Sequence, residues 1–233
     1  SKEDAIKKIN EILPWFTISN PNTPQRDTKG GLPKLDQIDE YSNNLLPDPN
    51  ALHYLETHRH WTTDVIEAHK IGITNDRKYF TLPIFAEGDL VNVRFYSPKG
   101  NHPWNDVKPK IKGVKGRNEI RIFPDSILKN DQDKVFLVEG EADVVAALSI
   151  GLNAVAFTGG AGNVPTDLHR LREKEIVIVY DNDDAGINGA KKVANALRRF
   201  TQQIKILQLG DLFPQANDLT DAISESGKDA VFK

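Results

Sequence analysis

The sequence contains no cysteine and no methionine among its 233 residues. Without cysteine, the chain can form neither a disulfide scaffold nor a thiolate zinc site of its own. No apolar run approaches the roughly 20 residues that a transmembrane helix needs, so we expect no membrane span. Because the chain begins with Ser1 and has no methionine, we expect it to be a fragment of a longer polypeptide.

Excess positive charge is also missing, since the formal net charge is −3. A protein that mainly coats nucleic acid would normally be basic. Any contact with nucleic acid is therefore expected to use a local basic patch or bound metal ions. Hydrophobic residues make up 39% of the chain and charged residues 27%, which is typical of a globular protein with a real core.

The first half of the chain has an irregular pattern of short elements. Helical spacing is seen at 2–13, and a Pro- and Gly-rich loop or linker is expected at 20–34. Residues 48–73 predict two short helices, the first started by Asp48 and Pro49 and the second capped by Thr62 or Thr63. Alternation over 79–97 predicts a hairpin with Gly88 in its turn. We predict a mixed α+β domain over residues 1–132.

From about residue 134 apolar strands alternate with helices. Strands are predicted at 134–140, 153–160, 175–181 and 203–210, and helices at 141–151, 164–174, 187–200 and 217–226. Strands that are almost continuously apolar and alternate with helices predict a parallel sheet with helices on both faces. We therefore predict an α/β domain over residues 133–233.

Acidic residues gather at the predicted carboxyl ends of these strands, where ligands of parallel α/β sheets bind. Glu139 follows the first strand and Asp143 lies one turn later. Asp181 and Asp183 follow the third strand, and Asp218 follows the fourth. Crowded carboxylates need a divalent cation, and two magnesium ions about 4 Å apart serve transfer at phosphorus. The alternative to metal binding is a purely structural role, in which these Asp residues form turns and cap helices.

A basic stretch precedes the acidic domain and could bind a triphosphate or a template backbone through phosphate contacts. Its alternative is a solvated loop. Trp104 could stack on a base, whereas Trp61 is expected to pack between helices. The candidate phosphate-binding residues are Arg94 on the hairpin and Lys108, Lys110, Lys112, Lys115 and Arg117.

The segments "VFLVEGEADVVAAL", "AVAFTGGAG", "IVIVYDNDDAG" and "NDLTDAI" together resemble the TOPRIM domain over about 100 residues. "ALHYLETHRHWTTDVIEAHKIGI", "LPIFAEGDLVNVRFYSPKG" and "VKPKIKGVKG" resemble the DnaG-type primase catalytic core, especially that of phage and plasmid primase–helicases. The chain departs from this pattern in lacking a zinc-binding module and in reading "TGGAG" where "GT" is common. "GGAGNVP" is a weak match to a dinucleotide-binding loop.

The resemblance implies a nucleotidyltransferase that makes RNA primers on single-stranded DNA from ribonucleoside triphosphates. It implies that Glu139, Asp181 and Asp183 are catalytic and hold Mg²⁺ or Mn²⁺, with Asp143 and Asp218 supporting. A replicative helicase domain in the same polypeptide and a cytoplasmic location, that of the host if a phage encodes the chain, are expected. The alternatives are a TOPRIM nuclease and a non-catalytic module that binds DNA or a helicase.

Overall fold

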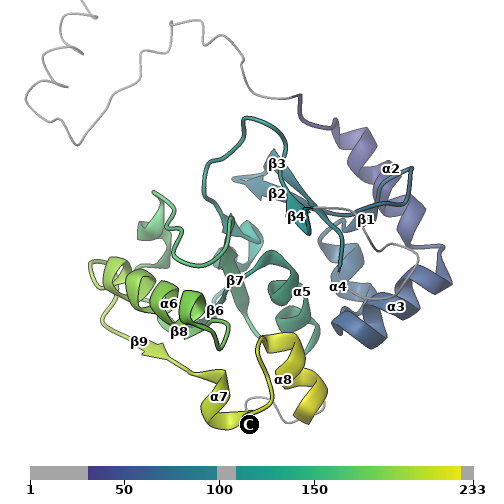
Figure 1. Cartoon of the computed structure of the whole chain (residues 1–233). Helices are drawn as coiled ribbons and strands as arrows, with labels where there is room; N and C mark the ends of the chain where they lie inside the picture. Colours follow the sequence, from purple (N-terminus) through teal and green to yellow (C-terminus); the bar gives the residue numbers. More distant parts are fainter. Residues whose placement is uncertain (1–30, 99–108, 227–233) are drawn as a thin grey trace, which may run out of the picture.

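The computed structural model describes residues 31–98 and 109–226. The predicted helix at 2–13, and nearly all of the loop at 20–34, lie outside these residues. Within them the chain forms two β-sheets with helices packed around both (Figure 1).

Three helices open the described chain: α2 (Leu35–Leu45), α3 (Pro49–Arg59) and α4 (Thr63–Ala68). Helix α3 begins as predicted, because Oδ1 of Asp48 accepts hydrogen bonds from the N–H groups of Asn50 and Ala51 at 3.0 and 3.1 Å. Helix α4 has Thr62 at its N-cap position, although the Thr62 side chain makes no capping hydrogen bond. The sequence interpretation missed helix α2.

The first sheet is antiparallel, with order β1 (Gly72–Ile73), β2 (Phe80–Ala86), β3 (Asp89–Tyr96) and β4 (Ile111–Lys112). The predicted hairpin of β2 and β3 is confirmed, and Ala86 pairs with Asp89 across its turn. Glu87 and Gly88 form that turn with φ of 55° and 98°. Positive φ at both central residues suits the twist of a two-residue hairpin.

The second sheet has the order β5 (Ile122–Phe123), β7 (Ala154–Phe157), β6 (Lys134–Val138), β8 (Glu175–Val179) and β9 (Ile204–Ile206). Strands β6 to β9 are parallel, as predicted, while β5 pairs antiparallel with β7. The second sheet thus starts earlier in the chain than residue 133. The division into 1–132 and 133–233 stays a prediction.

Helices α5 (Glu141–Ser149), α6 (Asp184–Leu197) and α8 (Leu219–Ser226) confirm three of the predicted helices, and a short helix α7 (Leu209–Leu212) precedes α8. The predicted helix at 164–174 is wrong. Only a 3₁₀ turn, η2 (Leu168–Leu171), forms there, and a second, η1 (Asp125–Lys129), follows β5. Leu168 and Leu171 are both buried, and their spacing of three matches the three-residue turn of a 3₁₀-helix.

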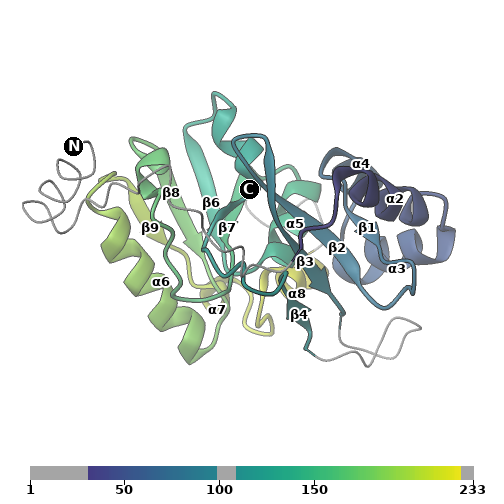
Figure 2. The same cartoon turned by 90° about the horizontal axis from the view of Figure 1, so that it is seen from above.

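Side-chain alternation divides the core between the two faces of the parallel sheet. Val135 and Leu137 face a cluster with α6, whereas Phe136 and Val138 face a cluster with α5 and α8. Figure 2 shows α6 and α5 on opposite sides of the strands. The cluster with α5 and α8 also includes apolar residues of the first sheet, and this packing joins the two sheets. No described helix has the length and apolar character needed to cross a membrane.

Candidate metal and nucleotide site

The carboxyl ends of β6 and β8 bring Glu139 and Asp181 together. The backbone N–H of Asp181 lies 3.3 Å from Oε2 of Glu139 and donates to it. The nearby backbone N–H of Ala161 also favours the charged form of the Glu139 carboxylate. Burial raises the pKa of Glu139 and the charge of Asp183 adds to the rise, while the N–H groups of Asp181 and Ala161 oppose it.

The glycine-rich segment after β7 shapes the backbone that reaches Glu139. Gly159, Gly160 and Gly162 have φ of 96°, 82° and 74°, a region that side chains other than glycine rarely enter. The turn that they make places the Ala161 N–H beside Glu139. The "TGGAG" departure from the family pattern therefore still supplies a backbone donor to this acid.

Asp143 and Asp181 carry the largest shifts among the acids. Burial raises the pKa of Asp143 to about 6, with a contribution from the charge of Asp218. Burial raises the pKa of Asp181 to about 8. Repulsion from nearby carboxylates adds to the rise, and these belong, in decreasing order of effect, to Asp143, Glu139, Asp218 and Asp183. The acids that the sequence predicted at separate strand ends therefore interact with one another.

Arg59 was missed by sequence reasoning. It is the last residue of α3, and its guanidinium lies 3.9 Å from Oδ1 of Asp143 and over the ring of Tyr96, at 5.7 Å from the ring centroid. Its side chain is only 14% exposed. The positive charge of Arg59 lowers the pKa of Asp143 against the effect of burial, so a helix of the first half of the chain stabilises the acid edge of the second.

Asp183 and Asp218 each cap a helix. Oδ1 of Asp183 accepts from the N–H of Gly186 at 2.7 Å, and Oδ1 of Asp218 accepts from the N–H of Asp221 at 2.8 Å. The capping alternative thus holds for one oxygen of each side chain. A Cβ at Gly186 would lie 2.2 Å from the carbonyl oxygen of Asp181, so glycine is needed for this close helix start.

These carboxylates fit a divalent cation in the chemistry of their donors. Among residues 31–98 and 109–226, no three acidic or histidine side chains form a group that could hold a metal ion by themselves. Magnesium commonly uses only one or two carboxylates and completes its shell with water and substrate phosphate. The mutual repulsion at Asp181 and Asp143 is what such a cation would relieve.

A cleft of about 400 Å³ lies beside this edge, lined by Arg94, Lys115 and Arg117 among others. Nε of Arg94 is 2.8 Å from Oε1 of the buried Glu141, close enough for an ion pair although the N–H does not point at the oxygen. The side-chain amide of Asn92 holds the loop that carries these cations. It donates to the carbonyl of Arg117 at 2.8 Å and accepts from the N–H of Val114 at 3.0 Å.

The predicted lysines differ in their surroundings. Lys110 is close enough to Glu139 and Asp143 to lower the pKa of both. Lys112 instead lies over the ring of Tyr79, with Nζ 4.0 Å from its centroid. Lys108 and Trp104 lie outside the described residues.

Trp61 is a core residue, as expected. It is fully buried and donates from Nε1 to the carbonyl of Ala142 at 3.1 Å.

Comparisons with known proteins agree with this geometry. The family model described as Toprim-like matches residues 136–223. The DNA primase of Lactococcus lactis subsp. lactis (strain IL1403) is 36% identical over 75 residues, which are 31% of this chain and 12% of that protein.

Among solved structures, the zinc-binding and RNA polymerase domains of Aquifex aeolicus primase match with a TM-score of 0.67 and 19% identity, over 84% of this chain and 57% of that one. The primase fragment of the bacteriophage T7 primase-helicase protein matches with a TM-score of 0.60 and 13% identity, over 95% of this chain and 83% of that one. This chain thus spans only part of the lengths of the Lactococcus and Aquifex proteins that it matches. Residues 136–223 form a Toprim-like domain, and the described chain has the fold of a DnaG-type primase catalytic core.

Proposed function

We propose that this chain is the catalytic core of a DNA primase, a nucleotidyltransferase that joins ribonucleotides into RNA primers on single-stranded DNA. The observation that carries the proposal is the acid edge of Glu139, Asp143, Asp181 and Asp218 within a primase fold. Burial and mutual repulsion raise the pKa of Asp181 to about 8, which marks a site built for a positive ligand.

The acids have separate roles in this proposal. Glu139, Asp181 and Asp183 hold Mg²⁺ or Mn²⁺, two ions in all, and Asp143 and Asp218 support them. When bound, such ions lower the pKa of the attacking 3′-hydroxyl and neutralise the triphosphate. Asp183 and Asp218 each have a second carboxylate oxygen beyond the one that caps a helix.

The cations of the first half of the chain bind phosphate. Lys110 lies near Glu139 and Asp143, where it would contact a triphosphate. Arg94, Lys115 and Arg117 line the cleft and would bind the template backbone without reading its sequence. Lys108 and Lys112 remain in the proposed set, Lys112 as a residue whose main contact here is an aromatic ring.

The proposed partners are single-stranded DNA, ribonucleoside triphosphates and a helicase domain in the same full-length polypeptide. The likeness to the fragment of the T7 primase-helicase protein supports the helicase. Replication takes place in the cytoplasm of bacteria, and the proposal places the protein there, or in the cytoplasm of a phage-infected host.

The test is primer synthesis by the chain on a mixed-sequence single-stranded template with labelled ribonucleotides and Mg²⁺. We expect short RNA products from the wild type and none from Asp181→Asn. Asp184→Asn is the matched control, because Asp184 is exposed and is not among the charges that raise the pKa of Asp181. Plasmid nicking is measured in parallel. Nicking without primers would favour the nuclease alternative, and wild-type primer yield from Asp181→Asn would refute the metal assignment.

A further inference from the structure

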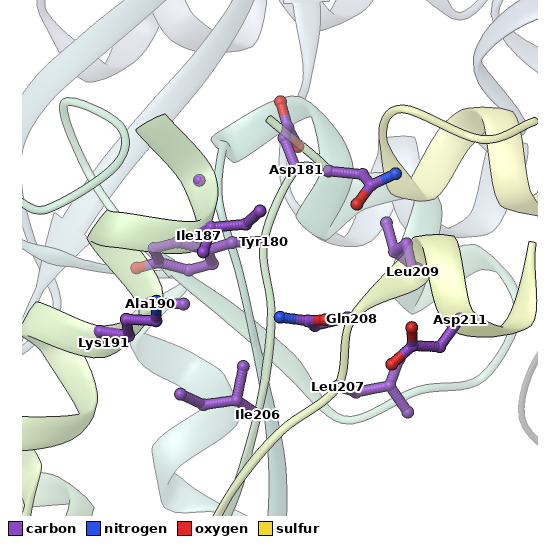
Figure 3. Close-up of a pocket in the computed structure, with 12 residues that line it drawn as sticks. Tyr180, Asp181, Ile187, Ala190, Lys191, Ile206, Leu207, Gln208, Leu209 and Asp211 are labelled. Carbon is purple, nitrogen blue, oxygen red and sulfur yellow. The ribbon is translucent and has the colours of Figure 1, made fainter. Parts of the chain in front are cut away.

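A second hollow lies beside the acid edge, between α6 and the segment from β9 to α7. Its volume is about 220 Å³, and Asp181 and Ile206 are among its lining residues. Figure 3 shows Asp181 at one end of the lining group and Ile206 towards the other, with Gln208 between them. The proposed roles of the acids and the basic cleft leave this pocket unused.

Polar groups without protein partners line this pocket. Tyr180 is only 4% exposed, and its hydroxyl makes no hydrogen bond within residues 31–98 and 109–226. The ring is buried, but the hydroxyl is not among the fully buried unpaired atoms, so it keeps accessible surface and is available to a ligand. The side-chain amides of Asn182 and Gln208 likewise have no hydrogen-bond partner in the described part of the chain.

The remaining wall is mostly apolar and carries one cation, Lys191, and one acid, Asp211. Ile187 and Ile206 contribute aliphatic surface, and Ile206 is 43% exposed, so a ligand could cover it. Lys191 on α6 has no carboxylate within ion-pair distance in the described chain. A ligand that covers Ile206 and meets Lys191 would remove apolar surface from water and pair a charge.

These groups suit a ligand that has a planar ring with hydrogen-bonding atoms on its edge and, next to the ring, a negatively charged group. An amide side chain offers a donor and an acceptor together, which matches the edge of a nucleobase. The pocket is smaller than the 300–1,000 Å³ of sites that enclose a whole drug-sized ligand. It therefore holds one part of a ligand, and the rest extends beyond its rim towards Asp181.

We propose that this pocket binds the base of a nucleoside triphosphate, whose phosphates extend from Lys191 towards the acid edge at Asp181. The inference rests on the proposed function, because it assigns the base of the nucleotide substrate to a place that the phosphate-binding residues leave open. Asn182 and Gln208 contact the edge of the base, and Ile187 and Ile206 contact its faces.

Calorimetric titration with ATP, and separately with tripolyphosphate, tests this assignment in the presence of Mg²⁺. Ile206→Asn and Gln208→Ala should each weaken ATP binding, by tenfold or more for Ile206→Asn, and should leave tripolyphosphate binding unchanged. Both substitutions are uncharged and lie at exposed positions, so the fold is expected to survive. Lys191→Ala should weaken both ligands. Arg199→Ala, which removes an exposed charge just beyond the other end of α6, should weaken neither.

Three results would overturn the inference: no ATP binding by the wild type at millimolar concentration, unchanged ATP binding by Ile206→Asn and Gln208→Ala, or equal loss of both ligands in these variants. Primer synthesis separates this outcome from failure of the proposed function. Primers made by a chain whose pocket variants bind ATP normally would refute the pocket alone. Pocket-dependent ATP binding without primers would refute the primase proposal alone.

Discussion

Replacing Asp181 by asparagine should stabilise the metal-free protein at neutral and alkaline pH. The pKa of Asp181 is about 8 in the folded chain, compared with about 3.9 for an unperturbed aspartate. Between these values the folded state retains a proton that the unfolded state has released. Stability therefore falls as pH rises from about 4 to about 8. Asparagine keeps the shape and has no such loss.

The size of the effect follows from the shift. Each pKa unit corresponds to about 1.4 kcal/mol, so four units set an upper limit of about 6 kcal/mol. Because Asp181 is only partly buried and water reaches the site, we expect a gain of about 2 kcal/mol at pH 8. In a chain of 233 residues this raises Tm by about 4–8 °C.

Thermal unfolding at pH 5 and pH 8 in EDTA measures this gain directly. Asp181→Asn should exceed the wild type by more at pH 8 than at pH 5, and Asp184→Asn should show no such pH dependence. Adding Mg²⁺ should stabilise the wild type and not Asp181→Asn, since only a bound ligand shifts the equilibrium. The reasoning is refuted if Asp181→Asn is no more stable than the wild type at pH 8 in EDTA.

Three further predictions concern the cations. Lys110→Ala should weaken triphosphate binding about tenfold, whereas Lys112→Ala, whose main contact is the Tyr79 ring, should weaken it only about two- to threefold, as measured by fluorescence anisotropy at one salt concentration; equal effects would contradict their different surroundings. Asn92→Ala removes hydrogen bonds that hold the basic loop and should cost about 1–3 kcal/mol in urea unfolding and weaken binding of labelled single-stranded DNA; unchanged DNA binding would show that the loop is not part of the interface. Glu141→Ala and Glu141→Gln both remove the charge that pairs with Arg94, and each should cost about 2–4 kcal/mol in urea unfolding; wild-type stability of Glu141→Gln would exclude a charge effect.

The sequence was sufficient to predict the parallel sheet because its strands are continuous apolar runs with both faces buried. The same apolar runs show where β6 and β8 end. Because the ends of neighbouring parallel strands lie at one edge of the sheet, the proximity of Glu139 and Asp181 could be predicted as well. Helix α2 could also have been found, since Ile38, Tyr41 and Leu45 have helical spacing and are buried. By contrast, the helix expected after Pro165 depended on local preference, and the chain there forms only a 3₁₀ turn.

The long-range ion pairs could not be predicted, because no local sequence pattern indicates which residues pair. Arg59 reaches Asp143 across 84 positions of sequence, and Arg94 reaches Glu141 across 47. Neither pairing can be deduced without knowing how α3 and the first sheet lie against α5. The capping role of Asp183 is different, because it is local and was an open alternative in the sequence: an Asp after a strand suits both a cap and a metal.

The most direct test of the acid edge as a metal site is diffraction from crystals soaked with Mn²⁺ and a ribonucleoside triphosphate, recorded at the manganese absorption edge. The account predicts anomalous peaks within about 2.3 Å of carboxylate oxygens of Asp181 and Glu139, next to the triphosphate. Manganese found with the nucleotide elsewhere on the chain, and none at this edge, would contradict it.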